Sequence, residues 1–197
     1  MRHLIISLFV VGCTPEPEPA GPGTIPARET SPESLPPPVP PTELEITVAL
    51  VDDPLAFKTS CGDLLASVSE TDGDRVLFVE IDDQIAYDAW SEGDVVERSY
   101  VLPHPSVTLR AEWGEYAAEA RGCDDVLEGK PVVVGSANAV EGTVHVAVDP
   151  DPTGNESEPR GTAVIRFDSV SLEQSDGTSA DLVDTELTDL FVGWYPG

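Results

Sequence analysis

The residues of this sequence that could do chemistry by type and spacing are few. Nucleophilic catalysis needs a nucleophile, a general base and a group that orients the base, and no Gly-x-Ser-x-Gly elbow is present. The candidate bases are His104, which lies between two prolines, and His145, on the polar phase of an alternating segment. We expect the first in an exposed turn and the second facing outward from a strand. With no phosphate-binding glycine loop or dinucleotide fingerprint either, the sequence predicts that the chain is not an enzyme.

One segment could hold a cation. Asp149, Asp151, Thr153 and Asn155 place oxygens at positions one, three, five and seven, and a glycine stands at six. This matches the front half of an EF-hand loop. Arg160 stands where the bidentate glutamate should be, and two prolines stiffen the loop, so an EF-hand is excluded. A Ca²⁺ site of another kind with these four ligands stays open. No other cofactor is expected.

The N-terminal residues have the pattern of a targeting signal. Residues 1–3 form a charged tip, residues 4–11 an apolar run, and Gly12 and Cys13 follow. This order is typical of a secretory signal, and the run is too short to span a bilayer. It resembles the lipobox of bacterial lipoproteins, which implies that Cys13 becomes the lipidated first residue. Thr14, rather than aspartate, follows the cysteine, and the same resemblance then implies an outer-membrane or cell-surface location.

A proline-rich stretch follows the lipobox. Residues 14–42 contain eleven prolines, which fix φ and remove backbone donors, so helix and sheet are both disfavoured. The few apolar side chains cannot offset the entropy of ordering. We therefore expect a signal peptide over residues 1–12, a lipidated cysteine and disordered stalk over 13–42, and one domain over 43–197.

Two cysteines remain in the predicted domain, Cys61 and Cys123. In an exported chain an even pair favours a disulfide. It would close a loop of about 60 residues and stabilise the domain by roughly 4 kcal/mol in the chain-entropy model. Two buried free thiols, or a metal site, are the alternatives, although zinc prefers about four clustered ligands.

The hydrophobic pattern of residues 43–197 is alternation. Period two predicts strands with one buried face. It is found over residues 44–50, 76–81, 107–113, 144–148 and 164–172, with glycine turn signals between them. The prediction is an all-β fold, an antiparallel β-sandwich (Ig-like or jelly-roll-like) of about nine to eleven strands; a closed barrel is the alternative. Residues 63–69 could form a helical turn, and residues 181–190 a loop or helical turn.

The charge excludes one class of partner. The chain has 37 acids against 10 bases, and the predicted domain alone carries a charge of about −25. Nucleic-acid binding relies on lysine and arginine that neutralise phosphates, so no nucleic-acid partner is expected. The acidity also suits a soluble, non-adhesive surface.

Together these patterns predict a non-catalytic, lipid-anchored extracytoplasmic protein with a binding or structural role at the cell envelope. It would be held to the membrane by the lipid on Cys13, with a protein or a glycan as its unknown partner. One alternative is a Ca²⁺-dependent or carbohydrate-binding module with a platform of Trp90, Trp113 and Trp194. The other is a secreted hydrolase, which a histidine and acids converging in a pocket would favour.

Overall fold

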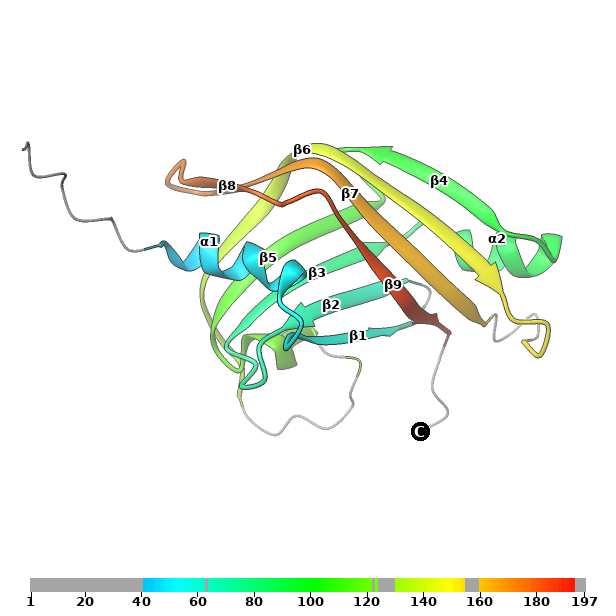
Figure 1. The fold of residues 1–197 in the computed structure, drawn as a ribbon, viewed down its shortest axis with the longest axis horizontal. Coiled ribbons are helices and arrows are strands. Elements are labelled where there is room, and N and C mark those ends of the chain that lie inside the picture. Colours follow the sequence, from blue (N-terminus) through cyan, green and yellow to red (C-terminus); the bar gives the residue numbers. More distant parts are fainter. Residues whose placement is uncertain (1–40, 63, 122, 124–129, 155–159, 194–197) are drawn as a thin grey trace, which may run out of the picture. The chain divides into compact units, whose positions relative to one another are not determined.

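The computed structural model of the chain describes residues 41–197, apart from residues 63, 122, 124–129, 155–159 and 194–197. The predicted signal peptide, Cys13 and nearly all of the predicted stalk therefore lie outside the described residues. The described part is built from strands, with two short α-helices and two 3-10 turns (Figure 1).

Nine antiparallel strands form a single sheet. In chain order they are β1 (Phe57–Cys61), β2 (Leu65–Ser69), β3 (Arg75–Ile81), β4 (Val96–Val101), β5 (Val107–Glu115), β6 (Val132–Pro150), β7 (Gly161–Gln174), β8 (Ser179–Asp181) and β9 (Thr185–Val192). The helical elements are α1 (Glu43–Val48), η1 (Ala49–Asp52), α2 (Ile85–Glu92) and η2 (Ala117–Arg121). The predicted all-β antiparallel class is confirmed.

The long strands β6 and β7 hold the two halves of the sheet together. They pair from Ala137 opposite Gln174 to Pro150 opposite Gly161. The first half of β6 also pairs with β5, which continues to β3, β2 and β1, and its second half pairs with β4. The first half of β7 pairs with β9 and its second half with β8. The layers expected of a sandwich are thus two halves of one sheet.

The sheet bends where the register between β6 and β7 shifts, so that one half folds over the other. The register shifts twice between Ala139 and Thr143. Gly142 lies there with φ of +114°, and a Cβ atom on it would come within 2.6 Å of the Cα atom of Val170. A bulge increases local twist, so this glycine lets one half fold over the other. At the far end, Gly62 and Gly193 form a β-bridge between the segments that follow β1 and β9.

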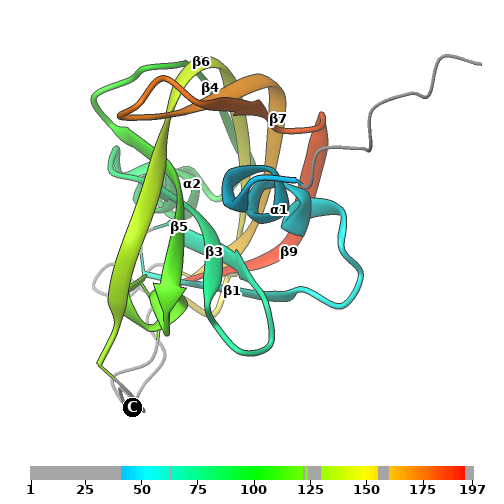
Figure 2. The ribbon, with the colours of Figure 1, turned by 90° about the vertical axis from the view of Figure 1, so that its left-hand side faces the viewer.

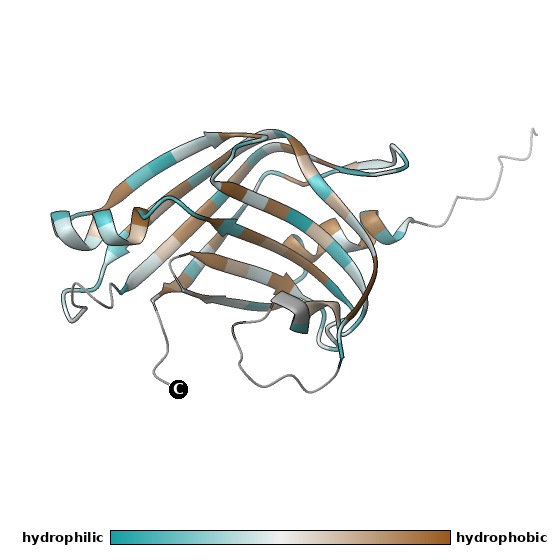
Figure 3. Cartoon of the chain, turned by 180° about the vertical axis from the view of Figure 1, so that it is seen from behind, coloured by the Kyte–Doolittle hydropathy of each residue, from teal (hydrophilic) through white to brown (hydrophobic). Residues whose placement is uncertain are grey.

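The main core lies between the facing halves (Figures 1 and 2). Val68, Leu77 and Leu109 come from one half, and Ile165 and Phe167 come from the other; all five are at most 3 % exposed. Apolar and polar colours alternate along the strands (Figure 3), and buried and more exposed residues alternate along β7. The inward-facing residues of both halves therefore form one core, which stabilises the fold by apolar burial.

The strand predicted over residues 44–50 is wrong, because these residues form α1 and η1. Thr42 caps α1: its hydroxyl accepts from the Glu45 N–H, and the Glu45 carboxylate accepts from the Thr42 N–H. This capping box is a strong helix-start signal. The alternating residues serve a helix equally well here, since Leu44 and Val48 are four positions apart and face the core together.

Other expectations for the secondary structure also need correction. Residues 65–69 form β2 rather than a helical turn, and residues 185–192 form β9, which pairs with β7. Helix α2 was not predicted; it ends at Gly93, a left-handed residue whose N–H bonds to the Ala89 carbonyl. Neither described α-helix has the length and apolar character needed to cross a membrane.

Candidate functional site

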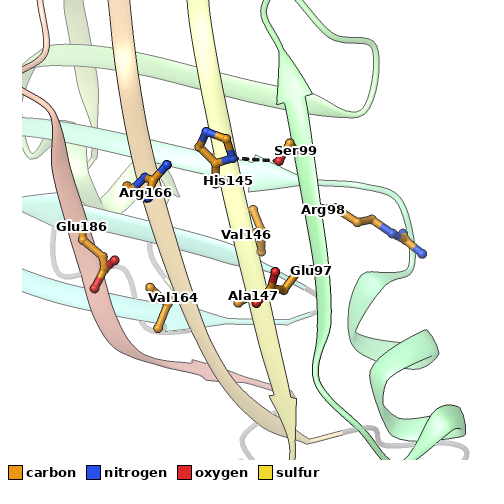
Figure 4. A pocket seen from close by; sticks show the side chains of 9 residues that line it. All are labelled: Glu97, Arg98, Ser99, His145, Val146, Ala147, Val164, Arg166 and Glu186. Carbon is orange, nitrogen blue, oxygen red and sulfur yellow. Dashed lines mark hydrogen bonds between the residues drawn. The ribbon is translucent and has the colours of Figure 1, made fainter.

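An open groove lies on the outer face of β4, β6, β7 and β9. One polar row crosses these four strands, because Ser99 pairs with His145, His145 with Arg166, and Arg166 with Glu186. We call these four residues the polar row. Their side chains lie on the outer face because the alternate residues Val146, Ile165 and Leu187 fill the core. The groove has a volume of about 310 Å³ (Figure 4).

His145 bonds through both ring nitrogens. The hydroxyl oxygen of Ser99 lies 2.7 Å from its Nδ1 atom, and Oδ2 of Asp168 lies 2.9 Å from its Nε2 atom. Ser99 is exposed, and His145 and Asp168 keep 34 % and 38 % of their side-chain surface in solvent. The predicted outward orientation of His145 is therefore correct, and its ring has partners on both neighbouring strands.

Arg166 and His145 both form hydrogen bonds to the carboxylate of Asp168. The Nε and Nη2 atoms of Arg166 lie 3.1 and 2.9 Å from the two carboxylate oxygens. These hydrogen bonds, and then the bond to His145, hold the pKa of Asp168 below its ordinary value. Asp168 is therefore ionised at neutral pH and accepts hydrogen bonds from both neighbours.

Small side chains lie between the charged ones in the groove. Ala147 and Val164 line it beside His145 and Arg166, with Glu97 and Glu186 at its sides (Figure 4). The groove thus combines two acids, a guanidinium, an imidazole and a hydroxyl with a limited apolar surface. Such a set can donate and accept hydrogen bonds, and its histidine can accept a proton.

Arg98 lies beside the groove but points away from it, toward α2 (Figure 4). Its guanidinium bonds to the carbonyl of Asp83 at 2.9 Å and pairs with the carboxylates of Asp83 and Asp88. Tyr100 donates its hydroxyl to Asp83 as well. This cluster joins α2 to β4, so we assign it a structural role.

The second candidate base, His104, has local partners. Its Nδ1 atom accepts from the N–H of Ser106, and its ring meets that of Tyr100 edge-on at 5.1 Å. It lies in the turn between β4 and β5, as the flanking prolines predict. These contacts come from its own turn and from the end of β4, so we assign His104 to the turn.

The described part of the predicted calcium loop forms its own turn. Asp149 lies near the end of β6, and the carboxylate of Asp151 accepts from the Thr153 N–H at 2.8 Å. That backbone bond is the main cause of the lowered pKa of Asp151. Asn155 lies outside the described residues. Within the described chain, no group of three or more histidine, cysteine, aspartate or glutamate residues is placed to hold a metal ion.

Cys61 and Cys123 form a disulfide, which fits the predicted pairing. Their Cα atoms lie 5.6 Å apart, within the range for this bond. Cys61 ends β1 and Cys123 follows η2, so the bond joins one end of the sheet to the turn that covers the outer face of β3. Its position indicates a structural role.

The described tryptophans do not line the groove. Trp113 packs against the core and over Gly135, where a Cβ atom would come within 2.3 Å of its ring. Trp90 lies on α2, with its ring 6.0 Å from that of Tyr87. Trp194 lies outside the described residues. The predicted aromatic platform therefore has no support from the two tryptophans that the structure describes.

Sequence reasoning identified His145 but missed its partners Ser99 and Asp168. Both lie on the polar phase of their strands, which was the available signal. Their convergence depends on the register of β4, β6 and β7, which residue types and spacing do not specify.

Comparisons with known proteins do not extend the assignment. No protein-family model matches the chain, and no curated protein or solved structure matches it significantly.

Proposed function

We propose that this chain is a lipid-anchored protein of the cell envelope, and that its domain binds a partner on the extracytoplasmic side. The proposal is carried by one observation, the cysteine directly behind a short apolar leader. A disulfide supports it, because such bonds persist in oxidising compartments. An outer-membrane or surface location follows from the lipobox resemblance and from Thr14.

The outer face of β4, β6, β7 and β9 is the binding face that we propose. His145, Arg166 and Asp168 are held in place there by hydrogen bonds to one another before any ligand arrives. Pre-ordered side chains reduce the entropy lost on binding. The domain charge of about −25 favours a neutral or basic partner over an anionic one.

The anchor is tested by replacing Cys13. Expressed in a bacterium with a lipidation pathway, the natural chain should partition into the detergent phase and carry lipid mass on the cysteine. Cys13→Ala should enter the aqueous phase or accumulate as an unprocessed precursor. Thr14→Ser is the matched control, because it leaves the cysteine and the leader intact. An alanine variant that is still lipid-modified would contradict the proposal.

Calcium binding is the alternative that a simple experiment separates from plain acidity. A site on the native state stabilises it by RT ln(1 + [L]/Kd), about 2.7 kcal/mol at a hundred times Kd, whereas any salt relieves repulsion in so acidic a domain. Thermal unfolding is therefore compared in CaCl₂, MgCl₂ and NaCl at matched ionic strength. We expect CaCl₂ and MgCl₂ to act alike. A saturable Ca²⁺ effect that Asp151→Asn removes would make calcium-dependent binding the better assignment.

A further inference from the structure

A serine, a histidine and an aspartate form one continuous hydrogen-bonded chain on the outer face. Ser99, His145 and Asp168 belong to three neighbouring strands, and 46 and 23 residues separate the bonded pairs. These are the group types that act as nucleophile, general base and orienting acid, and such sets are recognised by geometry and not by sequence order. The distances of 2.7 and 2.9 Å lie within hydrogen-bond reach.

The charges around the Ser99–His145–Asp168 hydrogen bonds determine which atom carries each proton. Asp168 is ionised because Arg166 bonds both of its oxygens, so it accepts the proton that His145 carries on Nε2. In the neutral imidazole the other nitrogen then has a free lone pair. Nδ1 therefore accepts the hydroxyl proton of Ser99, which is the direction that general-base activation of a serine requires.

We propose that Ser99 is a nucleophile activated by His145, and that the groove hydrolyses small activated esters. This activity goes beyond the proposed envelope role and does not depend on it. Oγ of Ser99 forms a bond to the ester carbonyl carbon while its proton passes to Nδ1 of His145. The bond from that carbon to the leaving oxygen breaks, and the leaving oxygen takes the proton. Water then cleaves the acyl-serine, so that ester and water give acid and alcohol.

The groove restricts which esters fit. Its volume of about 310 Å³ and its open form suit a short acyl group, and Ala147 and Val164 offer the apolar surface for it. Glu97 and Glu186 flank the groove and repel anionic substrates. The expected substrate class is therefore neutral or cationic esters with short acyl chains and good leaving groups.

The contacts of Asp168 also limit the rate. Arg166 neutralises part of the charge that would stabilise the His145 imidazolium, and water reaches both partners. A positioned general base contributes about 10²–10⁴-fold, and the exposure of His145 and Asp168 places this site at the lower end of that range. The rate should fall by about a hundredfold when either Ser99 or His145 is replaced.

The experiment follows p-nitrophenyl acetate hydrolysis by the full mature chain and its variants. Ser99→Ala and His145→Gln should each lose most of the protein-dependent rate. The matched controls, Ser179→Ala on β8 and His104→Gln in the β4–β5 turn, should keep it. After acid quenching, peptide mass spectrometry should find acetyl on Ser99. Ser99→Cys should still form an adduct, and unchanged melting temperatures would show that each variant is folded.

Three results would overturn the proposal. The first is a natural chain that hydrolyses the ester no faster than the denatured protein. The second is a Ser99→Ala variant that retains the rate while His145→Gln loses it, because His145 would then act alone as a surface imidazole. The third is an acetyl group that forms elsewhere at an equal rate and is absent from Ser99. None of these outcomes bears on the Cys13 anchor, so the two proposals fail separately.

Discussion

Strands β3 and β7 lie in opposite halves of one sheet and use their outer faces differently. In β3 the outward residues Val76 and Phe78 are buried, because Ala117 of η2 packs over them. In β7 the outward residues Arg166 and Asp168 reach solvent and join the candidate site. A strand covered on both faces becomes part of the scaffold, whereas a strand covered on one face can carry side chains for a ligand.

The largest expected loss of stability comes from a charge placed on the covered outer face of β3. Val76→Asp would bury a carboxylate opposite Glu112, which is itself 2 % exposed. An uncompensated buried charge costs several kcal/mol, so we expect a loss of about 3–5 kcal/mol in the free energy of unfolding. Urea unfolding measures it. Val164→Asp on the outer face of β7 is the control and should change stability by less than about 1 kcal/mol. Equal losses would show that the two outer faces do not differ.

The disulfide should come next in size. It closes a segment with a sequence separation of 62 residues and ties η2, the cover of β3, to the end of β1. Replacing Cys61 and Cys123 together by serine should lower the free energy of unfolding by about 4 kcal/mol in the chain-entropy model. A chain without the leader and Cys13 avoids other thiols. An unchanged urea midpoint would mean that the bond does not stabilise this half.

A smaller loss is expected at the cap of α1, which packs between the halves. Thr42→Ala removes the hydroxyl that accepts from the Glu45 N–H, and losing such a cap costs about 1 kcal/mol. Thr42→Ser keeps the hydroxyl and should restore most of the stability. Chemical unfolding of the three proteins provides the measurement. An alanine variant as stable as the natural chain would show that the packing of Leu44 and Val48 suffices.

The smallest effect at neutral pH concerns Tyr100, the inward neighbour of Ser99 on β4. Burial, and then its bond to Asp83, raise the pKa of Tyr100 above the ordinary value for tyrosine of about 10. The raised pKa contributes stability that is fully present below about pH 10 and is lost as the pH rises toward the folded-state pKa. Absorbance at 295 nm should show a late tyrosinate step that Tyr100→Phe removes. A natural chain without that late step would contradict this expectation.

The sequence was most informative for features that depend on local pattern or on residue counts alone. Alternation over residues 164–172 predicted a strand, which lies within β7, and the outward face of His145 on β6 followed from the same rule. The disulfide could be predicted because two cysteines leave one pairing within the domain. These inferences depend on local pattern or on simple counting, so long-range structure does not change them.

The failures share a physical cause. Residues 44–50 alternate like a strand, yet the Thr42–Glu45 capping box starts a helix, so local hydrogen bonds outweighed the hydrophobic period. Residues 65–69 became β2 because β1 and β3 lie ready to pair on either side. Ser99 and Asp168 could not be linked to His145, since strand register is set by the whole sheet.

Under the lipid anchor that we propose at Cys13, the position of α1 has a mechanical consequence. A pull on the residues ahead of Pro41 reaches the domain first at α1, through the Thr42 cap and the ion pair of Glu43 with Arg75 on β3. These contacts, and the burial of Leu44 and Val48, are separate, so they would yield one after another, while the sheet ladders share load across many hydrogen bonds. Under tension α1 would therefore leave first, and the space between the two halves would open while the strands remained paired.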